Sequence, residues 1–572
     1  MTIRKQLEKD LATAFKKLKF ETTLAQVSSS SVASVDYQCN ASFQLAKSVG
    51  KNPFDVANEI AGVFKSGIAT CGVSRPAFLN FSIKISALEK MGDFVLSHGK
   101  IPLAQQKKQM VFFDYGAPNI GKEMHIGHLR SPIIGEALKR VFESFGHATK
   151  ADNYLGDWGL PLGLIIGELE IQGVIKNNEL VGEITLELLN EIYPKASKRK
   201  DDDKDFLNKA RSITAQMQSG EEPYYSLWKQ IRQLSVEKIS KIYDEMFNCT
   251  FDFYNGESFA QPYVDVVIDI LKKKGLTYED KGCLLIDVKE ENENRPMPPF
   301  MLQKAGGGDL YATSDIATIY WRYKEFKPDQ FIYVVDDRQS LHFTQLFRIA
   351  KKGGMVSDNT KLVHVGLGTI NGKDGKPFRT RAGGTVRLED VIEMVSERVK
   401  GRVEESGRSL DKEVIKKIAL SALKFADLAG NVRSGYVFDI DKFTDFNGKT
   451  GPYLLYTVAR INSVLSKVDG GQIGNSKLVV GDDINEDIRK ILASVMKISD
   501  AYIGAMQSYS LNGIVESVYN LAQEFNTFYA NTNILKEKDA GKKALYLNIC
   551  TLVKKSLEFA LNTLAIDVVE SM

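Results

Sequence analysis

The stretch Met110-Val-Phe-Phe-Asp-Tyr-Gly-Ala-Pro-Asn-Ile-Gly-Lys-Glu-Met-His-Ile-Gly-His-Leu-Arg-Ser131 decides the fold. Its apolar start, residues 110–115, predicts a buried strand, and the glycines and proline of residues 116–121 predict a turn. The quartet at 125–128 then opens a helix. In α/β proteins, a parallel strand that leads into a helix N-terminus often binds phosphate, because backbone N–H groups and the helix dipole point at the anion.

The two histidines and the glycine between them suit a nucleotide site. His125 and His128 lie on the first helical turn, where each can donate a hydrogen bond to a phosphate oxygen. Gly127 has no side chain, so a flat ring can approach the backbone there. Two nearby histidines also occur by chance. The chain has only six histidines, however, and the strand–turn–helix context makes a chance pairing a weak explanation.

Alternating strand and helix patterns surround this stretch. They predict an α/β fold with a doubly wound parallel sheet of the Rossmann type between residues 106 and 400. The expected strands are 110–115, 148–155, 330–335 and 361–367, and the expected helices are 127–145, 161–173 and 340–353. The pattern loosens over about 174–300, which indicates an insertion.

A chain of 572 residues is too long for one hydrophobic core, and its length predicts three or four domains. The patterns along the chain divide it into three. Residues 1–105 predict an N-terminal α+β domain that starts with an amphipathic helix over 3–18. Residues 106–400 form the α/β domain. Residues 401–572 predict an all-α bundle, with helices at 411–433, 450–468, 484–507, 512–531 and 540–563.

The composition is that of an ordinary globular protein, with 43% hydrophobic and 26% charged residues and a net charge of +3. Charge alone does not indicate a nucleic-acid partner, which would need local basic patches. Five scattered cysteines without a Cys-x-x-Cys pair argue against disulfides and against zinc. Because neither a signal peptide nor an 18-residue apolar run is apparent, we expect a cytoplasmic protein.

The His-x-Gly-His quartet resembles the signature of class I aminoacyl-tRNA synthetases. The string from Pro118 to Ser131 resembles arginyl-tRNA synthetases of the bacterial type, and the resemblance covers most of the chain. It implies ATP-dependent ligation of L-arginine to its cognate tRNA through arginyl-adenylate, with release of AMP and pyrophosphate. ATP would be a substrate accompanied by Mg²⁺, without zinc. The family is usually monomeric, and its partners are tRNA(Arg), arginine and ATP, with no membrane.

Three later segments extend the resemblance. Gly156-Asp-Trp-Gly159 is similar to a family segment that lines the site, although a Trp-anchored core turn fits it equally well. The Tyr-Ala-Thr-Ser-Asp run at 311–315 resembles a Tyr-x-Thr-Ser-Asp motif. Residues 335–343 resemble a Val-Asp-x-x-Gln-x-x-His-Phe segment. The resemblance thus adds ATP-binding candidates beside the two histidines and Gly127, namely Gly156, Asp157 and His342.

A guanidinium substrate needs acidic partners, because its planar fork donates five N–H bonds and pairs with carboxylates. The resemblance assigns Asp114, Tyr311 and Asp315 to the arginine side chain, with Tyr311 and Asp315 at helical i, i+4 spacing. A lone Asp on a helix is usually just exposed, so Asp315 depends on the joint match. The remaining arginine-binding candidates are Asn119, Gln339, Ala117, Pro118, His128 and Asp336.

Residues 373–384, Lys-Asp-Gly-Lys-Pro-Phe-Arg-Thr-Arg-Ala-Gly-Gly, form a basic loop rich in glycine. Alone it suits a solvated surface turn, but its four cations also suit a clamp on a polyphosphate. It corresponds to the second class I signature, Lys-Met-Ser-Lys-Ser, in degenerate form. The resemblance implies that Lys376, Arg379 and Arg381 hold pyrophosphate. We expect Lys122 to add positive charge, which completes a catalytic set with His125, His128, Lys376 and Arg379.

Both ends of the chain resemble RNA-binding parts of the family. Residues 74–81 are similar to the N-terminal domain that touches the outer corner of the tRNA, and residues 450–460 to the start of the anticodon-binding domain. Tyr453 and Tyr456 would offer stacking faces and Arg460 a phosphate contact. Without the resemblance, two tyrosines at helical spacing are more often core residues.

Three other classes of protein match part of this pattern. A class I synthetase for another amino acid would lack the pair Asp114 and Asp315. A non-catalytic tRNA-binding relative usually loses the paired histidines or an RNA-binding end. A small-molecule nucleotidyltransferase with the histidine motif should lack the C-terminal helical domain. The resemblance also implies that tRNA must be bound before arginine is activated.

Overall fold

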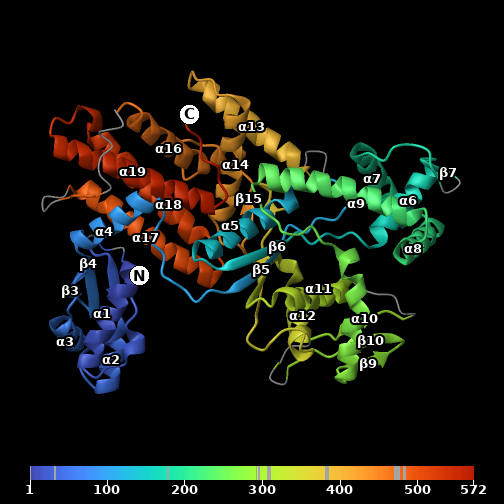
Figure 1. Ribbon diagram of the computed structural model, residues 1–572, viewed down its shortest axis with the longest axis horizontal. Helices are drawn as coiled ribbons and strands as arrows, with labels where there is room; N and C mark the ends of the chain where they lie inside the picture. The colour runs from blue at the N-terminus through green and yellow to red at the C-terminus, as the bar shows by residue number, and fades with distance from the viewer. Residues whose placement is uncertain are drawn as a thin grey trace. The chain divides into compact units, whose positions relative to one another are not determined.

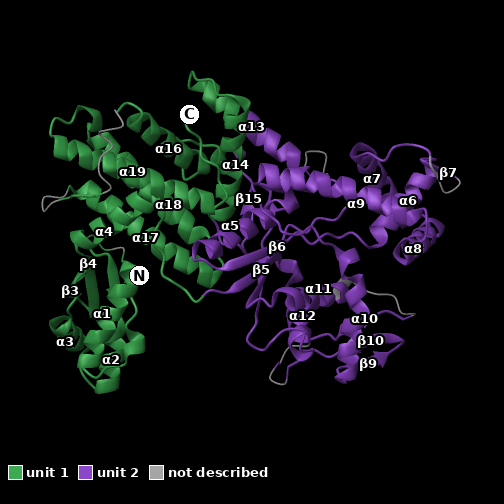
Figure 2. Cartoon of the chain, in the orientation of Figure 1, with its two compact units in different colours: residues 1–107, 398–429, 441–572 green, residues 108–397, 430–440 purple. Residues whose placement is uncertain are grey.

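In the computed structural model the chain forms two compact units (Figure 2). Unit 1 comprises residues 1–107, 398–429 and 441–572, and unit 2 comprises residues 108–397 and 430–440. The structure describes residues 2–30, 32, 34–176, 179–290, 293, 297–305, 311–379, 386–468, 477–480 and 485–572, without the side chains of 179, 180, 311 and 312.

The core of unit 2 is a four-stranded sheet in the order β13-β12-β5-β6, and each pairing is parallel. The strands are β5 (Met110–Tyr115), β6 (Ala148–Asp152), β12 (Gln330–Asp336) and β13 (Lys361–Leu367). The predicted doubly wound parallel sheet is therefore confirmed.

Helices cover both faces of this sheet. Since successive side chains of a strand point to opposite faces, each strand contributes to the packing on both sides. Phe113 packs edge-on against Phe142 of α5 (Arg130–Ser144), with ring centroids 5.7 Å apart. Phe112 points the other way, into a core shared with α10 (Glu257–Lys273), α11 (Tyr311–Phe326) and α12 (Ser340–Lys352). Figure 1 shows α5 on one side of β5 and β6, and α11 and α12 on the other. Burial on both faces explains why the two central strands, β5 and β12, are mainly apolar.

Strand β6 ends three residues before the end of the predicted strand 148–155. Beyond Asp152 the backbone stays extended but pairs with the segment before α10 instead of with β5. Asn153 N donates to Phe253 O at 3.0 Å, and Leu155 N donates to Asn255 O at 2.8 Å. The strand-like pattern of residues 153–155 thus reflects pairing with a distant loop, which short-range periodicity does not identify.

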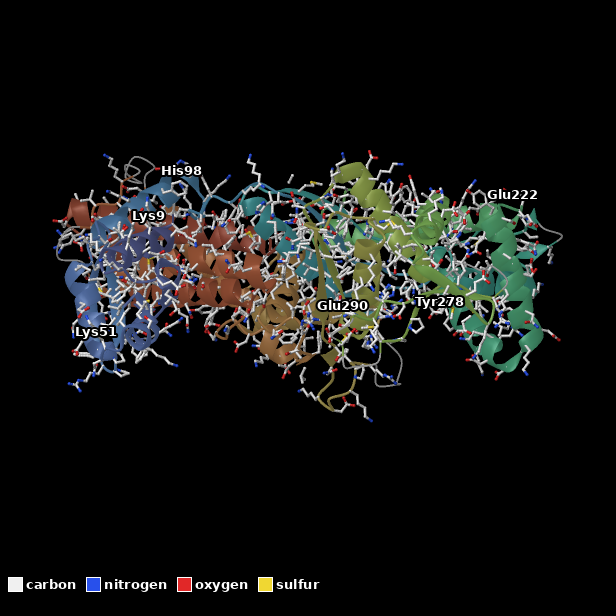
Figure 3. All side chains as sticks on the ribbon, turned by 90° about the horizontal axis from the view of Figure 1, so that it is seen from below. Lys9, Lys51, His98, Glu222, Tyr278 and Glu290 are labelled. Carbon is white, nitrogen blue, oxygen red and sulfur yellow. The ribbon has the colours of Figure 1, made fainter. Side chains whose placement is uncertain are left out.

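The weakly patterned residues 174–300 are mostly helical. They contain α7 (Leu186–Asp202), α8 (Lys204–Ser219), α9 (Tyr224–Ser240) and α10, followed by an antiparallel sheet of β9 (Thr277–Asp280), β10 (Cys283–Ile286) and β11 (Phe300–Gln303). Helix α6 (Leu160–Ile171), predicted over 161–173, packs on α7 and α8. Tyr278 of β9 is exposed at the surface (Figure 3).

The N-terminal part of unit 1 has the expected α+β composition. Its antiparallel sheet has the order β1-β2-β4-β3, with β1 (Ser28–Ser29), β2 (Tyr37–Cys39), β3 (Ala69–Ser74) and β4 (Phe78–Ile83). The helices of this part are α1 (Ile3–Lys17), α2 (Ala41–Val49), α3 (Pro53–Val63) and α4 (Ile85–His98).

The rest of unit 1 is a helical bundle, as predicted. Its main helices are α14 (Lys412–Leu428), α16 (Gly451–Leu465), α17 (Glu486–Ser508), α18 (Asn512–Asn531) and α19 (Ala540–Thr563). Helix α4 packs against α17 and α19, and Arg489 of α17 donates to Asp36 at 2.6 Å. The N-terminal part and the bundle therefore form one compact unit. None of the helices described is both long and apolar enough to cross a membrane.

Substitution of Gly135 by alanine should destabilise unit 2. A methyl group there would lie 2.3 Å from Cγ of Tyr115, a fully buried ring whose hydroxyl donates to Glu136 at 2.5 Å. We expect a loss of about 1–3 kcal/mol in the free energy of unfolding, because the helix must move off the sheet. Urea unfolding followed by tryptophan fluorescence measures this, since all three tryptophans lie in unit 2.

Gly504→Ala is the matched control. Gly504 lies inside α17, and a methyl group there meets no atom of the described residues within 4 Å. Alanine favours the helix, so this variant should leave the tryptophan transition of unit 2 unchanged. Equal urea midpoints for Gly135→Ala and the parent protein would contradict the close packing of α5 on β5.

Candidate active site

The two histidines of the first motif form a reciprocal cap on a short 3-10 turn, Ile126–His128, which precedes α5. His125 N donates to Nδ1 of His128 at 3.0 Å, and Gly127 N donates to Nδ1 of His125 at 3.0 Å. Because each Nδ1 accepts a backbone hydrogen bond, each neutral ring carries its proton on Nε2. Both rings therefore offer an N–H donor on the side away from the backbone.

Burial keeps these rings uncharged. It lowers the pKa of His128 to about 3, with further lowering by the positive charges of His125 and Lys122. It also lowers the pKa of His125, again with help from Lys122. At neutral pH the pair consists of two neutral donors beside one cation, an arrangement that suits phosphate oxygens.

The structure adds a reason for a glycine at position 127. A Cβ atom there would lie 2.7 Å from Cε1 of His125. Glycine is thus needed to make room for the ring of His125 itself. The rings of His125 and His128 lie close together, with centroids 4.0 Å apart.

The segment after the basic loop pairs with the histidine motif. Ile126 N donates to Val386 O at 3.0 Å, and Leu388 N donates to Met124 O at 2.9 Å. On its other side, the loop starts from β14 (Ile370–Asn371), where Phe378 N donates to Ile370 O at 3.0 Å. The backbone thereby returns from the loop directly to the histidines.

Of the loop cations, Lys376 and Arg379 are exposed, and Arg381 lies outside the described residues. Lys122 is half-buried, with its Nζ 5.5 Å from the ring centroid of Tyr193, and burial lowers its pKa.

A cavity of about 580 Å³ lies at the carboxyl edge of the parallel sheet. It brings together predicted residues from β5 and the turn after it, from the segment after β6, from α11, and from α12 with the 3-10 turn that precedes it. These predicted lining residues are Asp114, Ala117, Asn119, Gly156, Asp315, Gln339 and His342. Residues that are more than 200 positions apart in the chain thus meet in one site.

Asp114 is held at the back of this cavity by an internal arginine. Its Oδ2 accepts from Nη1 of Arg322 at 2.7 Å, and Nη2 of Arg322 reaches Oδ2 of Asp152 at 2.8 Å. Asp114 and Asp152 are direct neighbours in the β5–β6 pairing. Burial raises the pKa of Asp114 to about 7, although Arg322 counteracts this.

Asp315 and Asn119 are also fixed by specific contacts. Oδ2 of Asp315 lies 2.7 Å from Nε2 of His342, so α11 and α12 meet across the cavity. Asn119 pairs with Gly156 as an isolated parallel bridge, and a Cβ at Gly156 would lie 2.0 Å from Oδ1 of Asn119. Gly156 is therefore required for this turn to approach Asn119.

Comparisons with known proteins identify the family of the chain. Residues 91–440 match the family model for tRNA synthetases class I (R), catalytic domain. The models for the arginyl tRNA synthetase N terminal domain and the DALR anticodon binding domain match residues 1–83 and 454–572. The chain belongs to the arginyl-tRNA synthetases.

Two curated relatives named arginine–tRNA ligase illustrate the membership. The protein from Alkaliphilus oremlandii is 38% identical over 554 residues, and that from Agathobacter rectalis is 37% identical over 561 residues, each with 94% of both chains covered. The crystal structure of arginyl-tRNA synthetase from Plasmodium falciparum has a TM-score of 0.85 at 24% identity over the full length of both chains, which shows the same fold.

Some residues expected at the arginyl-tRNA synthetase site lie outside the described cavity lining. Asp157 is fully buried, where it accepts from Arg232 at 2.8 Å and from Ser258. Asp336 binds its neighbour Arg338 at 2.6 Å. Pro118 and His128 also do not line it. The side chain of Tyr311 lies outside the described residues.

The cavity of this family member also contains residues that sequence reasoning missed, notably Tyr154, Glu257, Thr318 and Arg322. Thr318 and Arg322 follow Asp315 on α11 at spacings of three and seven, so helical periodicity was a usable signal for them. Glu257 begins α10, which lies outside every motif segment and more than 50 residues from the nearest one, and no short-range pattern singles it out.

The predicted RNA-binding residues lie in unit 1. Tyr456 and Arg460 line a cavity of about 370 Å³ together with Arg402, Arg408 and Met572. The Cζ of Arg460 is 4.8 Å from the ring centroid of Tyr456. Tyr453 is not part of this lining, because its ring packs on Tyr519 and its hydroxyl accepts from Asn526 at 2.9 Å.

The ring of His128 should stay neutral across the physiological range. In an unfolded chain histidine titrates near pH 6.5, whereas the folded-state pKa is about 3. Since the unfolded state binds the proton first, stability contributed by this site is lost as pH falls below about 6.5. NMR spectra of histidine-labelled protein, assigned with a His128→Gln variant, should show no titration between pH 5 and 8. A midpoint near 6.5 in folded protein would contradict the buried cap.

Proposed function

We propose that the cavity at the sheet edge binds L-arginine and that the adjoining histidine pair binds ATP. The chain, as a member of its family, ligates arginine to tRNA in an ATP-dependent reaction through arginyl-adenylate. The observation that carries the assignment of the site is the meeting of Asp114 and Asp315 in one cavity. Asp114 lies on β5, whose following turn leads to His125 and His128, and Asp315 lies on α11.

The acidic lining supports recognition of the guanidinium group. Asp315 presents a partly exposed carboxylate held by His342, and Asp114 lies deeper, held by Arg322. A planar cation with five donors suits two carboxylates at different depths. In this proposal Tyr311 adds a hydroxyl group. The polar end of arginine is met by Asn119 and Gln339, and Ala117 lines the same cavity.

ATP lies on the histidine side in this proposal. The two Nε2–H groups donate to phosphate oxygens, and Lys122, Lys376, Arg379 and Arg381 add positive charge. An oxygen of the arginine carboxylate attacks the α-phosphorus, and the bond to pyrophosphate breaks. A terminal ribose hydroxyl of tRNA then attacks the arginyl carbonyl, and AMP leaves. Positioning and charge stabilisation supply the catalysis, so no protein nucleophile is required.

Magnesium would accompany ATP. The residues that the structure describes contain no cluster of three or more His, Cys, Asp or Glu side chains suited to a metal ion. In this proposal Mg²⁺ would accompany the phosphate groups of ATP and offset their charge, and the scattered cysteines, which include no Cys-x-x-Cys pair, argue against a zinc site. Gly156 and His342, which line the cavity, are the remaining candidates for ATP binding. Asp157 is buried, and in this proposal it acts indirectly by stabilising the turn that contains Gly156.

The tRNA would contact both ends of the chain. We propose three functional parts: residues 1–105 for the outer corner of the tRNA, 106–400 for catalysis, with an insertion at 174–300, and 401–572 for the anticodon. The cavity with three arginines and Tyr456 supports the last assignment, since aromatic and guanidinium groups bind unpaired nucleotides. A cytoplasmic monomer remains part of this proposal, as free cysteines are typical of a reducing compartment.

Asp315→Asn should lower kcat/KM for arginine about 10- to 100-fold, because a charge-assisted hydrogen bond to the guanidinium is lost. The assay is arginine-dependent ATP–pyrophosphate exchange with and without cognate tRNA, and with lysine as the competing amino acid. Asp358→Asn, at an exposed loop position, is the matched control and should behave as the parent protein.

Exchange with arginine alone, and only when tRNA is present, is the expected result for the parent protein. Exchange without tRNA would support the arginine and ATP sites, but it would contradict the expectation that tRNA must bind before arginine is activated. Folded parent protein that binds tRNA yet gives no exchange under either condition would overturn the proposed site.

Tyr456→Ala should weaken tRNA binding about tenfold, because one stacking face and the packing of Arg460 are lost. Filter binding with cognate tRNA at fixed salt measures the change. Tyr453→Phe, which removes only the hydroxyl that accepts from Asn526, serves as the control and should bind like the parent. If Tyr456→Ala and the parent protein bind tRNA with equal affinity, the anticodon does not bind at Tyr456.

A further inference from the structure

Helix α7 of the insertion contacts Lys122 and Glu123, which lie just before the histidine motif. Nδ2 of Asn190 donates to Oε1 of Glu123 at 2.7 Å, and the ring centroid of Tyr193 lies 5.5 Å from Nζ of Lys122. Asn190 and Tyr193 are three positions apart on the helix, so they share one face of it. One face of α7 therefore contacts both side chains.

Helix α7 is itself fixed within unit 2. Ala196 of this helix packs in a small core with Leu164 of α6 and Phe206 of α8. Nε of Arg199, near the end of α7, donates to Oε2 of Glu168 of α6 at 2.7 Å. A helix anchored in this way can hold the side chains before the histidine motif in place.

Glu123 is the carboxylate next to Lys122 in the chain, yet it is bound elsewhere. Besides the bond from Asn190, its Oε1 accepts from Nη1 of Arg387 at 3.2 Å, and Arg387 is itself paired with Asp390 at 2.7 Å. Glu123 thus joins α7 to the segment after the basic loop. Among the residues that the structure describes, no carboxylate forms an ion pair with Lys122.

The ring of Tyr193 is a suitable partner for a lysine that must stay charged. An ammonium group is attracted to the face of an aromatic ring, and a ring without net charge does not neutralise it. Burial lowers the pKa of His125 and His128, and the charge of Lys122 lowers both further. The positive charge of Lys122 therefore acts at the histidine pair, where an anion can use it.

We propose that Tyr193 and Asn190 position Lys122 for the phosphate groups of ATP. The ring of Tyr193 holds the ammonium group, and Asn190 keeps the carboxylate of Glu123 away from it. A carboxylate paired with Lys122 would compete with the phosphate oxygens, because the attraction between opposite charges is strongest at short range. Neither positioning residue lines the cavity at the sheet edge, so both act through Lys122. This inference rests on the proposed role of Lys122 beside ATP.

Tyr193→Leu removes the ring and keeps an apolar side chain. In ATP–pyrophosphate exchange with cognate tRNA and saturating arginine, this variant should lower kcat/KM for ATP about fivefold to tenfold, because the cation–π contact is lost. The KM for arginine should stay at the parent value, since the arginine cavity is unchanged. Tyr193→Phe keeps the ring and should retain the parent kcat/KM for ATP.

A double-mutant cycle shows whether Tyr193 acts through Lys122. Lys122→Met alone should lower kcat/KM for ATP at least about 100-fold, because a charge that stabilises the transition state is removed. In the Lys122→Met background, Tyr193→Leu should cause no further loss. Tyr278→Leu, at an exposed tyrosine of β9, is the matched control and should behave as the parent in both backgrounds. Tryptophan fluorescence in urea shows whether each variant retains unit 2.

Asn190→Ala tests the second contact. Without this donor Glu123 can turn to Lys122, and kcat/KM for ATP should fall about twofold to fivefold, the effect of one partly exposed ion pair. Adding Glu123→Gln should restore the rate, because a neutral amide does not pair with Lys122. A parent-like rate in Asn190→Ala, or a loss that Glu123→Gln does not restore, overturns the role of Asn190.

The outcomes separate this inference from the proposed function. A parent-like Tyr193→Leu, or an equal loss from this substitution in the parent and Lys122→Met backgrounds, overturns the role of Tyr193 while that of Lys122 stands. Parent-like exchange in Lys122→Met overturns the role of Lys122, and the inference with it.

A graded change of the ring decides if Tyr193→Leu fails to fold or Lys122→Met gives no measurable rate. Phenylalanines with an increasing number of ring fluorines at position 193 keep the shape of the ring but weaken its negative face. The kcat/KM for ATP should fall stepwise with fluorination, while the KM for arginine stays level. Equal rates for all the rings reject the inference.

Discussion

Arg322 joins the two acids that end neighbouring strands, and the geometry of the site depends on this ion bridge. Asp114 and Asp152 are adjacent in the β5–β6 pairing, and both are buried. Two carboxylates so placed repel each other and lose hydration, so they need a cation from outside the sheet. Helix α11 supplies it at 2.7 and 2.8 Å. The same helix carries Asp315, so the bridge also sets the position of that residue.

Charge is divided between two neighbouring regions of unit 2. The histidine cap provides two neutral N–H donors with Lys122 nearby, whereas the cavity at the sheet edge collects carboxyl groups. In the proposed reaction the polyanionic nucleotide occupies the first region and the cationic amino acid the second. One strand–turn–helix segment thus contributes a carboxylate to the cationic substrate and N–H donors to the anionic one, since Asp114 and His125 are only eleven positions apart.

Periodicity and short motifs predicted the architecture well. The parallel strands, the helices on both faces and the C-terminal bundle follow from alternating apolar patterns, and α18 and α19 have their predicted bounds. The end of β6 was predicted three residues too late, since residues 153–155 pair with a loop about 100 residues later. The glycine at 127, which is expected to admit a flat ligand ring, also makes room for the ring of His125, and only the structure shows this second role.

The sequence by itself determined the family, the order of elements and most of the acids and histidines of the site, because these lie in short motifs whose spacing reflects local backbone geometry. Only the tertiary structure decided which of these residues share a cavity and which are already paired with another side chain. Asp157 is buried and paired with Arg232, and Asp114 is bridged to Asp152 by Arg322. Glu257, from the distant helix α10, lines the same cavity as Asp114. Pairing and burial depend on contacts between segments far apart in the chain, which local patterns do not encode.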